Sequence, residues 1–153
     1  MPSVLQRLKF FRRTIPHAVA ITRDWYRDIK LGIRTIGFNP PLEQDPSFYK
    51  DMCGYEASFY SWLINTAEYL HLDGKDVFVD IGCGKGRTLI FMAGKDFKKI
   101  IGVELDGRLL DIARENIDRI KEPAIPIELI NADAAELIIK EGTVFFIFNP
   151  FGR

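Results

Sequence analysis

The stretch that most limits how this chain can fold is residues 76–94, which read DVFVDIGCGKGRTLIFMAG. An apolar run leads into glycines at alternate positions, Gly82, Gly84 and Gly86, and a helical pattern follows them. Glycine allows a tight turn and lets a ligand lie directly against bare backbone. The stretch therefore predicts a strand, a glycine loop at its carboxyl end, and a helix.

The same alternation continues toward the end of the chain. Further strands are predicted over residues 99–105, 125–130 and 143–148, and a further helix over 107–120. Strands that alternate with helices indicate an α/β fold with a parallel sheet and right-handed crossovers. Ligands bind beyond the carboxyl ends of the strands in such sheets, which is where the glycine loop lies.

Charge is unevenly distributed along the 153 residues. Residues 1–36 contain eight Lys or Arg and two acidic residues, a net charge of +6, and residues 37–153 carry −6. A basic arm on an acidic body can attract polyanions. The alternative is a solvated pair of amphipathic helices that covers the domain. We divide the chain into a basic helical extension with a loop, residues 1–54, and a ligand-binding domain, residues 55–153.

Three helices are expected before the first strand, over about residues 3–13, 16–31 and 57–70. The second of them is expected to bury its large apolar residues, Val19, Trp25 and Ile29. A proline-rich segment, GFNPPLEQDP, separates the second helix from the third and is predicted to be a loop.

Composition indicates which cellular compartment and which kinds of site to expect. Cys53 and Cys83 are too few for a disulfide framework, so a reducing compartment is expected. No stretch approaches the roughly 20 apolar residues of a membrane span, and we expect a cytoplasmic protein. His17 and His71 stand apart from other metal-binding side chains, so no metal site is predicted.

An acidic residue, Asp80, lies two positions before Gly82 at the mouth of the glycine loop. A dinucleotide brings a pyrophosphate, which a carboxylate repels. S-adenosylmethionine brings an ammonium and a sulfonium group, which a carboxylate attracts. The spacing is also GxGxG, with Arg87 where the dinucleotide fingerprint continues, so an NAD(P)-dependent oxidoreductase is the disfavoured alternative. The sequence leaves open whether Lys85 and Arg87 face substrate or solvent.

Two more acidic residues follow later strands. Glu104 ends the second strand, where an acid can accept hydrogen bonds from both ribose hydroxyls of an adenosine ligand. Asp133, after the third strand, can accept a hydrogen bond from an adenine amino group, and the backbone N–H of Ala134 can donate one to the ring. Asp133 can equally serve as a turn former.

The ordered set Asp80-x-Gly82-x-Gly84-x-Gly86, Glu104, Asp133 and Asn149-Pro150-Phe151 resembles the motifs of class I S-adenosylmethionine-dependent methyltransferases. From about residue 28 the chain also resembles small bacterial methyltransferases of unassigned substrate, loosely described as Dot1-like. The resemblance implies that the loop from Asp80 to Gly86, Cys83 included, binds the cofactor together with Glu104, Asp133 and Ala134. Tyr55 and Glu56 lie in a segment that reaches over the cofactor in that family, and they can equally be capping residues.

The same resemblance implies a Rossmann-like sheet with helices on both faces and the strand order 3-2-1-4. The family has seven strands, so we expect a chain truncated after the fourth, whose exposed edge can support self-association. A catalytically inactive cofactor-binding module is a further alternative.

In amino-methylating members an [N/D]-P-P-[Y/F] tip places the acceptor nitrogen. Here Asn149 and Pro150 match, and Phe151 comes one position early. Because the second Pro is absent, the tip favours a nitrogen acceptor only weakly over an oxygen or carbon acceptor, and the acceptor itself stays unidentified. Phe151 can alternatively be a core residue at the end of the strand.

Overall fold

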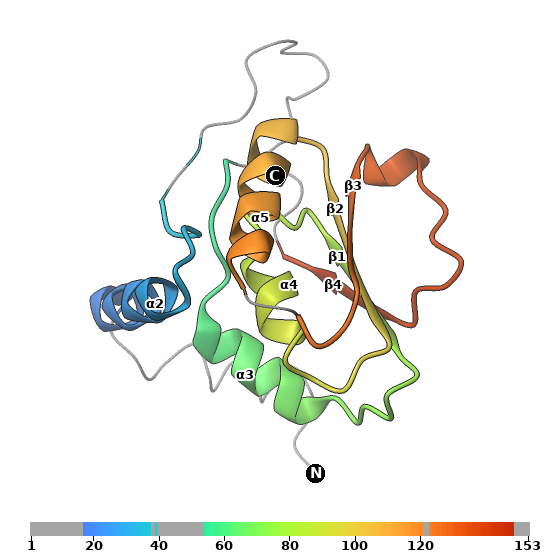
Figure 1. The fold of residues 1–153 in the computed structure, drawn as a ribbon, viewed down its shortest axis with the longest axis horizontal. Helices are drawn as coiled ribbons and strands as arrows, with labels where there is room; N and C mark the ends of the chain where they lie inside the picture. The colour runs from blue at the N-terminus through green and yellow to red at the C-terminus, as the bar shows by residue number, and fades with distance from the viewer. Residues whose placement is uncertain (1–16, 38, 40–53, 121–122, 149–153) are drawn as a thin grey trace.

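We analysed a computed structural model, which describes residues 17–37, 39, 54–120 and 123–148. A sheet of four parallel strands forms the centre of the molecule (Figure 1). The strands are β1 (Val77–Ile81), β2 (Lys99–Glu104), β3 (Ile127–Asn131) and β4 (Val144–Ile147). Their order is β3-β2-β1-β4, which confirms the expected arrangement.

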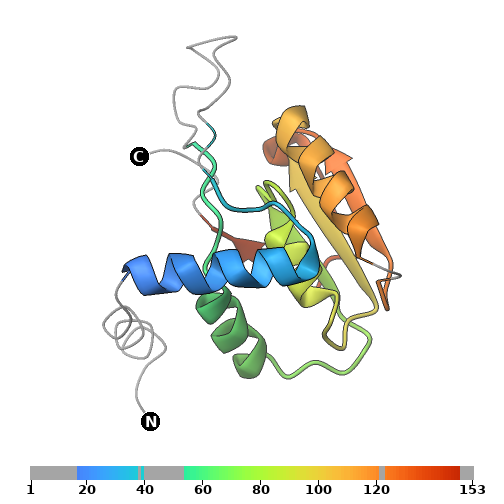
Figure 2. The same cartoon turned by 60° about the vertical axis from the view of Figure 1, so that its left-hand side comes forward.

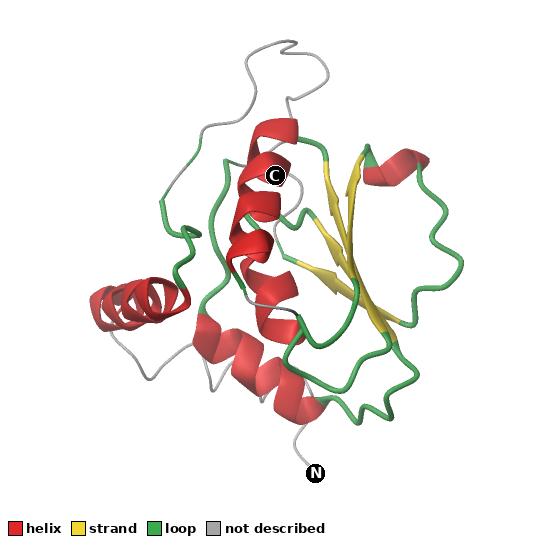
Figure 3. Ribbon diagram, viewed as in Figure 1, coloured by secondary structure: helices red, strands yellow, loops and turns green. Residues whose placement is uncertain are grey.

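The helices are α2 (His17–Leu31), α3 (Tyr60–Tyr69), α4 (Arg87–Met92), α5 (Gly107–Arg119) and the 3-10 helix η1 (Ala134–Glu136). Figure 3 shows α4 and α5 on one face of the sheet, with α3 and α2 farther out on that side. The opposite face carries η1 and the extended segments that flank it. Helices were expected on both faces, and the second face receives only this single turn in the described part of the chain.

Apolar side chains alternate between the two faces of the central strands, as the period of two in a strand requires. On the helical face, Phe78 and Ile100 pack with Leu89 and Met92 of α4. On the opposite face, the valines of β1 and β2 pack with Ile101 and with residues around η1. The central strands β1 and β2 are thus buried between two apolar layers, which fixes their position relative to the helices.

The strand register brings the polar strand ends together. Asp80 pairs with Gly102 of β2, and Glu104 pairs with Asn131 of β3. Because all four strands run in the same direction, their carboxyl ends meet at one edge of the sheet. The candidate site is at this edge.

Helix α2 is present as expected, but the prediction of its buried face was wrong. Val19, Trp25 and Ile29 are each more than half exposed, with fractions of 56, 55 and 53 %. The buried face instead carries Asp24 and Asp28. These two acids are turned inward because they bind a cation, Arg87, at the start of α4.

Helix α3 begins at Tyr60, three residues later than predicted. Its first N–H, that of Tyr60, donates a hydrogen bond to Asp24 Oδ2 at 3.0 Å. The preceding residue, Phe59, makes no side-chain capping bond to the helix. A side chain from α2 therefore accepts the hydrogen bond of a free backbone N–H at the start of α3. The sequence around α3 does not reveal this partner.

Strand β4 is an edge strand in the described sheet. Phe146 packs on the helical face, whereas Phe145 and Ile147 are exposed on the other face. This confirms the predicted apolar edge. No helix among the described residues is long and apolar enough to cross a membrane. The predicted helix over 3–13 lies outside the described residues.

Candidate functional site

The glycine loop joins β1 to α4 at the carboxyl edge of the sheet. Gly82, Gly84 and Gly86 all have positive φ values, of 77°, 52° and 82°. Residues with a side chain rarely adopt this backbone conformation, so the turn itself requires the alternating glycines. The N–H groups of Gly82 and Cys83 both donate to the Val103 carbonyl at 2.9 Å, which ties the loop to the end of β2.

Glu104 lies beneath this loop and is buried. Its Oε2 accepts a hydrogen bond from the Gly84 N–H at 2.8 Å, and its Oε1 accepts one from the Asp106 N–H at 2.9 Å. Burial raises the pKa of Glu104, although these N–H groups oppose the shift. The side chain that was predicted to hold ribose thus also holds the loop, and each oxygen retains a lone pair for a ligand.

Asp80 is the most unusual acid of the site, because its side chain is buried and has no ion pair among the described residues. Burial, together with the nearby charge of Glu104, raises the pKa of Asp80 to about 8, while a hydrogen bond with Thr88 opposes the shift. A carboxyl with this pKa holds its proton at neutral pH and is then uncharged. A cation that enters beside it stabilises the ionised form.

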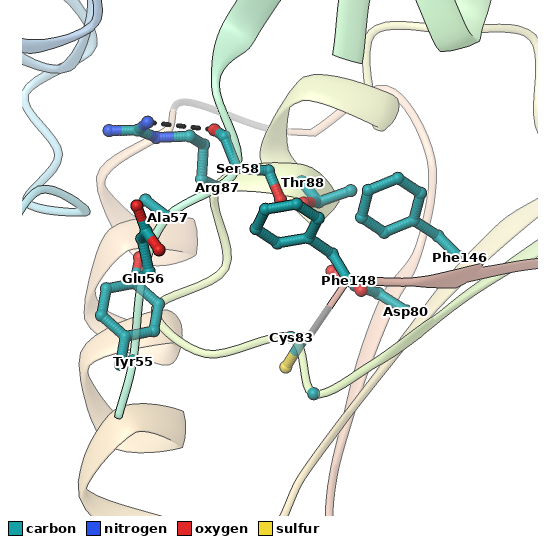
Figure 4. A pocket seen from close by; sticks show the side chains of 11 residues that line it. Tyr55, Glu56, Ala57, Ser58, Asp80, Cys83, Arg87, Thr88, Phe146 and Phe148 are labelled. Atoms are coloured by element: carbon teal, nitrogen blue, oxygen red, sulfur yellow. Dashed lines mark hydrogen bonds between the residues drawn. The ribbon is translucent and has the colours of Figure 1, made fainter. Parts of the chain in front are cut away.

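A cavity opens beside Asp80, between the glycine loop, the segment 55–58 and the end of β4 (Figure 4). Its volume is about 290 Å³, including solvent at its mouth. The residues that line it are Tyr55, Glu56, Ala57, Ser58, Asp80, Gly82, Cys83, Arg87, Thr88, Phe146 and Phe148. Carboxylate, hydroxyl and aromatic groups therefore surround one small space.

Tyr55 covers the glycine loop from the outside. A Cβ on Gly84 would overlap the Tyr55 ring, so the ring lies directly on the bare backbone. The Tyr55 hydroxyl donates to the Thr35 carbonyl at 2.7 Å, and Lys85 Nζ lies 4.6 Å from the ring centroid. The sequence left Tyr55 open as a capping residue or a ligand contact, and the structure places it in the cavity wall.

Lys85 and Arg87 do not face solvent, since both side chains are buried. Lys85 Nζ lies 3.5 Å from the carbonyl oxygens of Ile36 and Gly37, and burial lowers its pKa. Arg87 lines the cavity, but its guanidinium turns toward Ser58 and α2 (Figure 4). Both cations hold earlier parts of the chain against the loop.

Cys83 also lies in the cavity wall and is the free, buried thiol of the loop. Burial and the neighbouring Asp80 and Glu104 raise its pKa well above the usual value. The thiol therefore stays protonated and acts as a small neutral group.

Asp133 and Ala134 lie at the same edge of the sheet, beyond the end of β3, and do not line the cavity. Asp133 Oδ1 accepts a hydrogen bond from the Ala135 N–H at 2.8 Å, so it forms the turn that starts η1. Asn131 Nδ2 donates to the Glu104 carbonyl at 2.8 Å and joins this turn to the end of β2. The predicted residues Asn149, Pro150 and Phe151 lie outside the described residues.

Sequence reasoning missed several residues that build the site. Phe146 and Phe148 line the cavity, and the Phe148 ring packs against Trp62 of α3 at 5.4 Å between centroids. Asp24 and Asp28 bind Arg87. A signal for this pair existed, because they are the two acids among residues 1–36 and are spaced four residues apart, on one face of a helix.

The described residues contain no cluster of three or more side chains able to hold a metal ion.

Comparison with known proteins shows which family this part of the chain resembles. A family model described as a methyltransferase domain matches residues 78–152. A crystal structure of an RNA methyltransferase from Salinibacter ruber, in complex with S-adenosyl-L-homocysteine, is similar with a TM-score of 0.54. It is 26 % identical, and the match covers 60 % of each chain.

Two curated relatives are also similar in sequence. Indolepyruvate C-methyltransferase from Streptomyces griseus is 26 % identical over 124 residues, which are 78 % of this chain and 37 % of that protein. The H3 lysine-79-specific histone-lysine N-methyltransferase from Dictyostelium discoideum is 28 % identical over 123 residues, which are 69 % of this chain and 7 % of that protein. The chain thus spans well under half the length of either relative.

The family match begins within β1 and includes the glycine loop, Glu104 and the ends of β3 and β4. The parallel β3-β2-β1-β4 sheet places these segments at one edge. Residues 78–152 therefore belong to the methyltransferase domain family, and the chain carries the Rossmann-like fold of the class I S-adenosylmethionine-dependent methyltransferases.

Proposed function

We propose that this protein binds S-adenosylmethionine at the carboxyl edge of its sheet and transfers the methyl group to an acceptor. The observation that carries the proposal is Asp80, a buried carboxyl in the wall of a cavity, beside a glycine loop and without a cationic partner among the described residues. Such a group favours a ligand that brings its own positive charge.

The residues present fit this cofactor. Asp80 would face its positively charged groups, and Gly82, Cys83, Gly84 and Gly86 would form the loop that holds it, with Gly82 and Cys83 in the cavity wall. The free lone pairs of Glu104 would accept hydrogen bonds from the ribose hydroxyls. Asp133 and the backbone of Ala134 would hold the adenine, farther along the same edge.

When bound, the cofactor supplies a methyl group on a positively charged sulfur. The protein's part is then to place the acceptor lone pair in line with the bond that breaks, so positioning contributes most of the rate. We assign this placement to Asn149, Pro150 and Phe151, which follow β4 in sequence. The Asn149 side chain and a Pro150 carbonyl can accept hydrogen bonds from an amino group, so this tip favours a nitrogen acceptor.

The relatives do not point to a single class of methyl acceptor. Their names give an RNA, an indolepyruvate carbon and a histone lysine as targets, and these differ in size and in acceptor atom. What these names share is methyl transfer. Two alternatives to an active methyltransferase are a cofactor-binding module without catalysis, because the chain spans only part of its relatives, and an NAD(P)-dependent oxidoreductase.

Two contacts with partners extend the proposal. The exposed Phe145 and Ile147 on edge strand β4 would support self-association. The excess of Lys and Arg in residues 1–36 would give weak contact with polyanions. We place the protein in the cytoplasm, because a buried free thiol suits a reducing compartment.

Isothermal titration of the protein with S-adenosyl-L-homocysteine tests the proposal, with NADH as the competing ligand. We expect saturable binding of S-adenosyl-L-homocysteine at one site per chain and none of NADH at the same concentration. Tight NADH binding by folded protein, with no heat from S-adenosyl-L-homocysteine, would overturn the proposal in favour of the oxidoreductase. Methyl transfer to candidate acceptors then separates an enzyme from a binding module.

A further inference from the structure

A buried ionic network joins α2 to the start of α4. Arg87 Nη1 donates to Asp24 Oδ2 at 3.1 Å, and Nη2 donates to Asp28 Oδ2 at 3.3 Å. The side chains of all three residues are at most 4 % exposed. Arg87 is the first residue of α4 and follows Gly86 directly, so the network acts on the end of the glycine loop.

Thr35 links this network to the segment that crosses the loop. Its Oγ1 accepts from Arg87 Nε at 2.6 Å and donates to Asp28 Oδ2 at 2.7 Å. Its backbone N–H donates to the same Asp28 oxygen at 2.9 Å, and its carbonyl accepts from the Tyr55 hydroxyl. Thr35 therefore connects the buried acids of α2 to the tyrosine that covers Gly84.

The other side of the loop is held by α5. Asn116 is fully buried, and its Nδ2 donates to the Lys85 carbonyl at 2.9 Å and to the Arg34 carbonyl at 3.2 Å. Its Oδ1 accepts from the Arg34 N–H at 2.9 Å. The segment that contains Arg34 and Thr35 is thus fastened to Lys85 and Arg87, where the loop enters α4. Figure 2 shows α2 in front of α4, with this segment running up from its end.

Burying three charges carries a large desolvation cost, so such a network is weak evidence for stability alone. Its value here is geometric, because the planar guanidinium binds two carboxylates, a hydroxyl and the Ser58 carbonyl in fixed directions. The Tyr60 ring also lies 4.8 Å from its Cζ. The segments before the sheet thereby set the path of the loop after β1.

We propose that Asp24, Asp28, Thr35 and Arg87 form a brace that holds the glycine loop, and Tyr55 above it, in the shape that binds the cofactor. They are positioning residues, and α2 is part of the cofactor site although it precedes the family match in sequence. The inference rests on the proposed function for its ligand. The geometry of the loop is a property of the ligand-free protein and can be measured without any ligand.

Amide hydrogen exchange of the ligand-free chain is the first arm of the test. The N–H groups of Gly82, Cys83, Gly84 and Gly86 all donate hydrogen bonds within the protein and should be protected. In Asp28→Asn, which loses the charge and keeps the shape, we expect these amides to exchange at least about tenfold faster at temperatures where the chain stays folded. If Asp28→Asn does not fold, the same exchange measurement is made on Thr35→Val, which is a smaller change.

Titration with S-adenosyl-L-homocysteine is the second arm, with an expected loss of affinity of roughly tenfold or more in both variants. Arg87→Lys should show the same loss of affinity, because one ammonium group cannot replace the planar guanidinium and its several N–H donors. The control is Phe97→Leu, which weakens the buried core at the opposite end of β2. It lowers stability and should leave loop exchange and affinity unchanged.

The outcomes separate the two proposals. If Asp28→Asn only lowers stability, with loop exchange and affinity like those of Phe97→Leu, the brace is overturned. If the unaltered protein does not bind S-adenosyl-L-homocysteine, the proposed function fails. The exchange measurement still decides whether the four residues hold the loop.

Discussion

The ring of Tyr55 lies directly on Gly84, and no side chain larger than hydrogen fits between them. The contact joins residues 29 positions apart, from a segment before the sheet and from the loop after β1. Because Tyr55 is also fixed by its hydrogen bond to Thr35, it cannot move away freely. The Tyr55 ring therefore covers the glycine loop at Gly84.

Gly84→Ala should distort the loop and displace Tyr55. We expect a loss of stability of about 1–2 kcal/mol from the positive φ, and a larger relative loss of S-adenosyl-L-homocysteine affinity, of tenfold or more. Gly32→Ala is the matched control, because Gly32 has a similar positive φ of 68° and no atom within 4 Å of an added Cβ. Urea unfolding and titration check both variants, and equal affinities would show that the contact does not shape the site.

Asp80 should make the folded chain less stable as pH rises. Its pKa is raised to about 8, so between about pH 4 and pH 8 the folded chain keeps a proton that the unfolded chain releases. The free energy of unfolding therefore falls through this window, by an amount on the order of a few kcal/mol.

Asp80→Asn should flatten this dependence, leaving a residual slope of the same sign from Glu104, whose pKa is also raised. Urea unfolding at pH 5 and pH 8 measures the slope. Asp76→Asn is the control, since Asp76 lies next to the opposite end of β1 and bonds Thr143. Identical slopes in the unaltered chain and in Asp80→Asn would contradict the assigned pKa.

The apolar edge of β4 should drive concentration-dependent association. Ile147→Lys places a charge on the exposed face of an unpaired strand, which natural sheets use to prevent edge pairing. Sedimentation velocity over a range of concentrations should show association of the unaltered chain and less of it in the variant. Ile138→Lys is the control, since Ile138 is 83 % exposed and lies outside β4. Association that is equal in both variants would exclude the β4 edge.

The basic arm should bind polyanions through charge alone. Replacing Arg7, Lys9, Arg12 and Arg13 by Gln removes four of the excess charges of residues 1–36. We expect weaker retention on heparin and a smaller dependence of retention on salt concentration. Unchanged elution of the variant would show that the arm makes no such contact.

The strands, their order and the glycine loop could be predicted because their signals are local or arise from family motifs. A continuous apolar run gives β1, as in a strand buried on both faces, and the positive φ of Gly82, Gly84 and Gly86 explains why only glycine suits those positions. The location of Asp80 at the carboxyl edge of the sheet could also be predicted, because Asp80 is near the end of β1.

The orientation of α2 could not be predicted in the same way. Hydrophobic periodicity assigns Trp25 and Ile29 to the core, but the helix buries the acids that pair with Arg87, 59 or more residues away. Specific ion pairing with a distant residue thus overrides the apolar pattern of the helix. The Tyr55–Gly84 contact is hidden for the same reason, because neither residue's neighbours in sequence reveal its partner.

The pH dependence of S-adenosyl-L-homocysteine affinity tests most directly whether Asp80 binds the ammonium group, which this compound shares with the cofactor. Since Asp80 has a pKa of about 8 before binding, its carboxyl must lose a proton to pair with the ligand. The account predicts that Kd falls by about tenfold per pH unit from pH 6 to pH 8, and that Asp80→Asn binds at least about tenfold more weakly at pH 8 with no such slope. A Kd that is independent of pH, and equally low in Asp80→Asn, would contradict it.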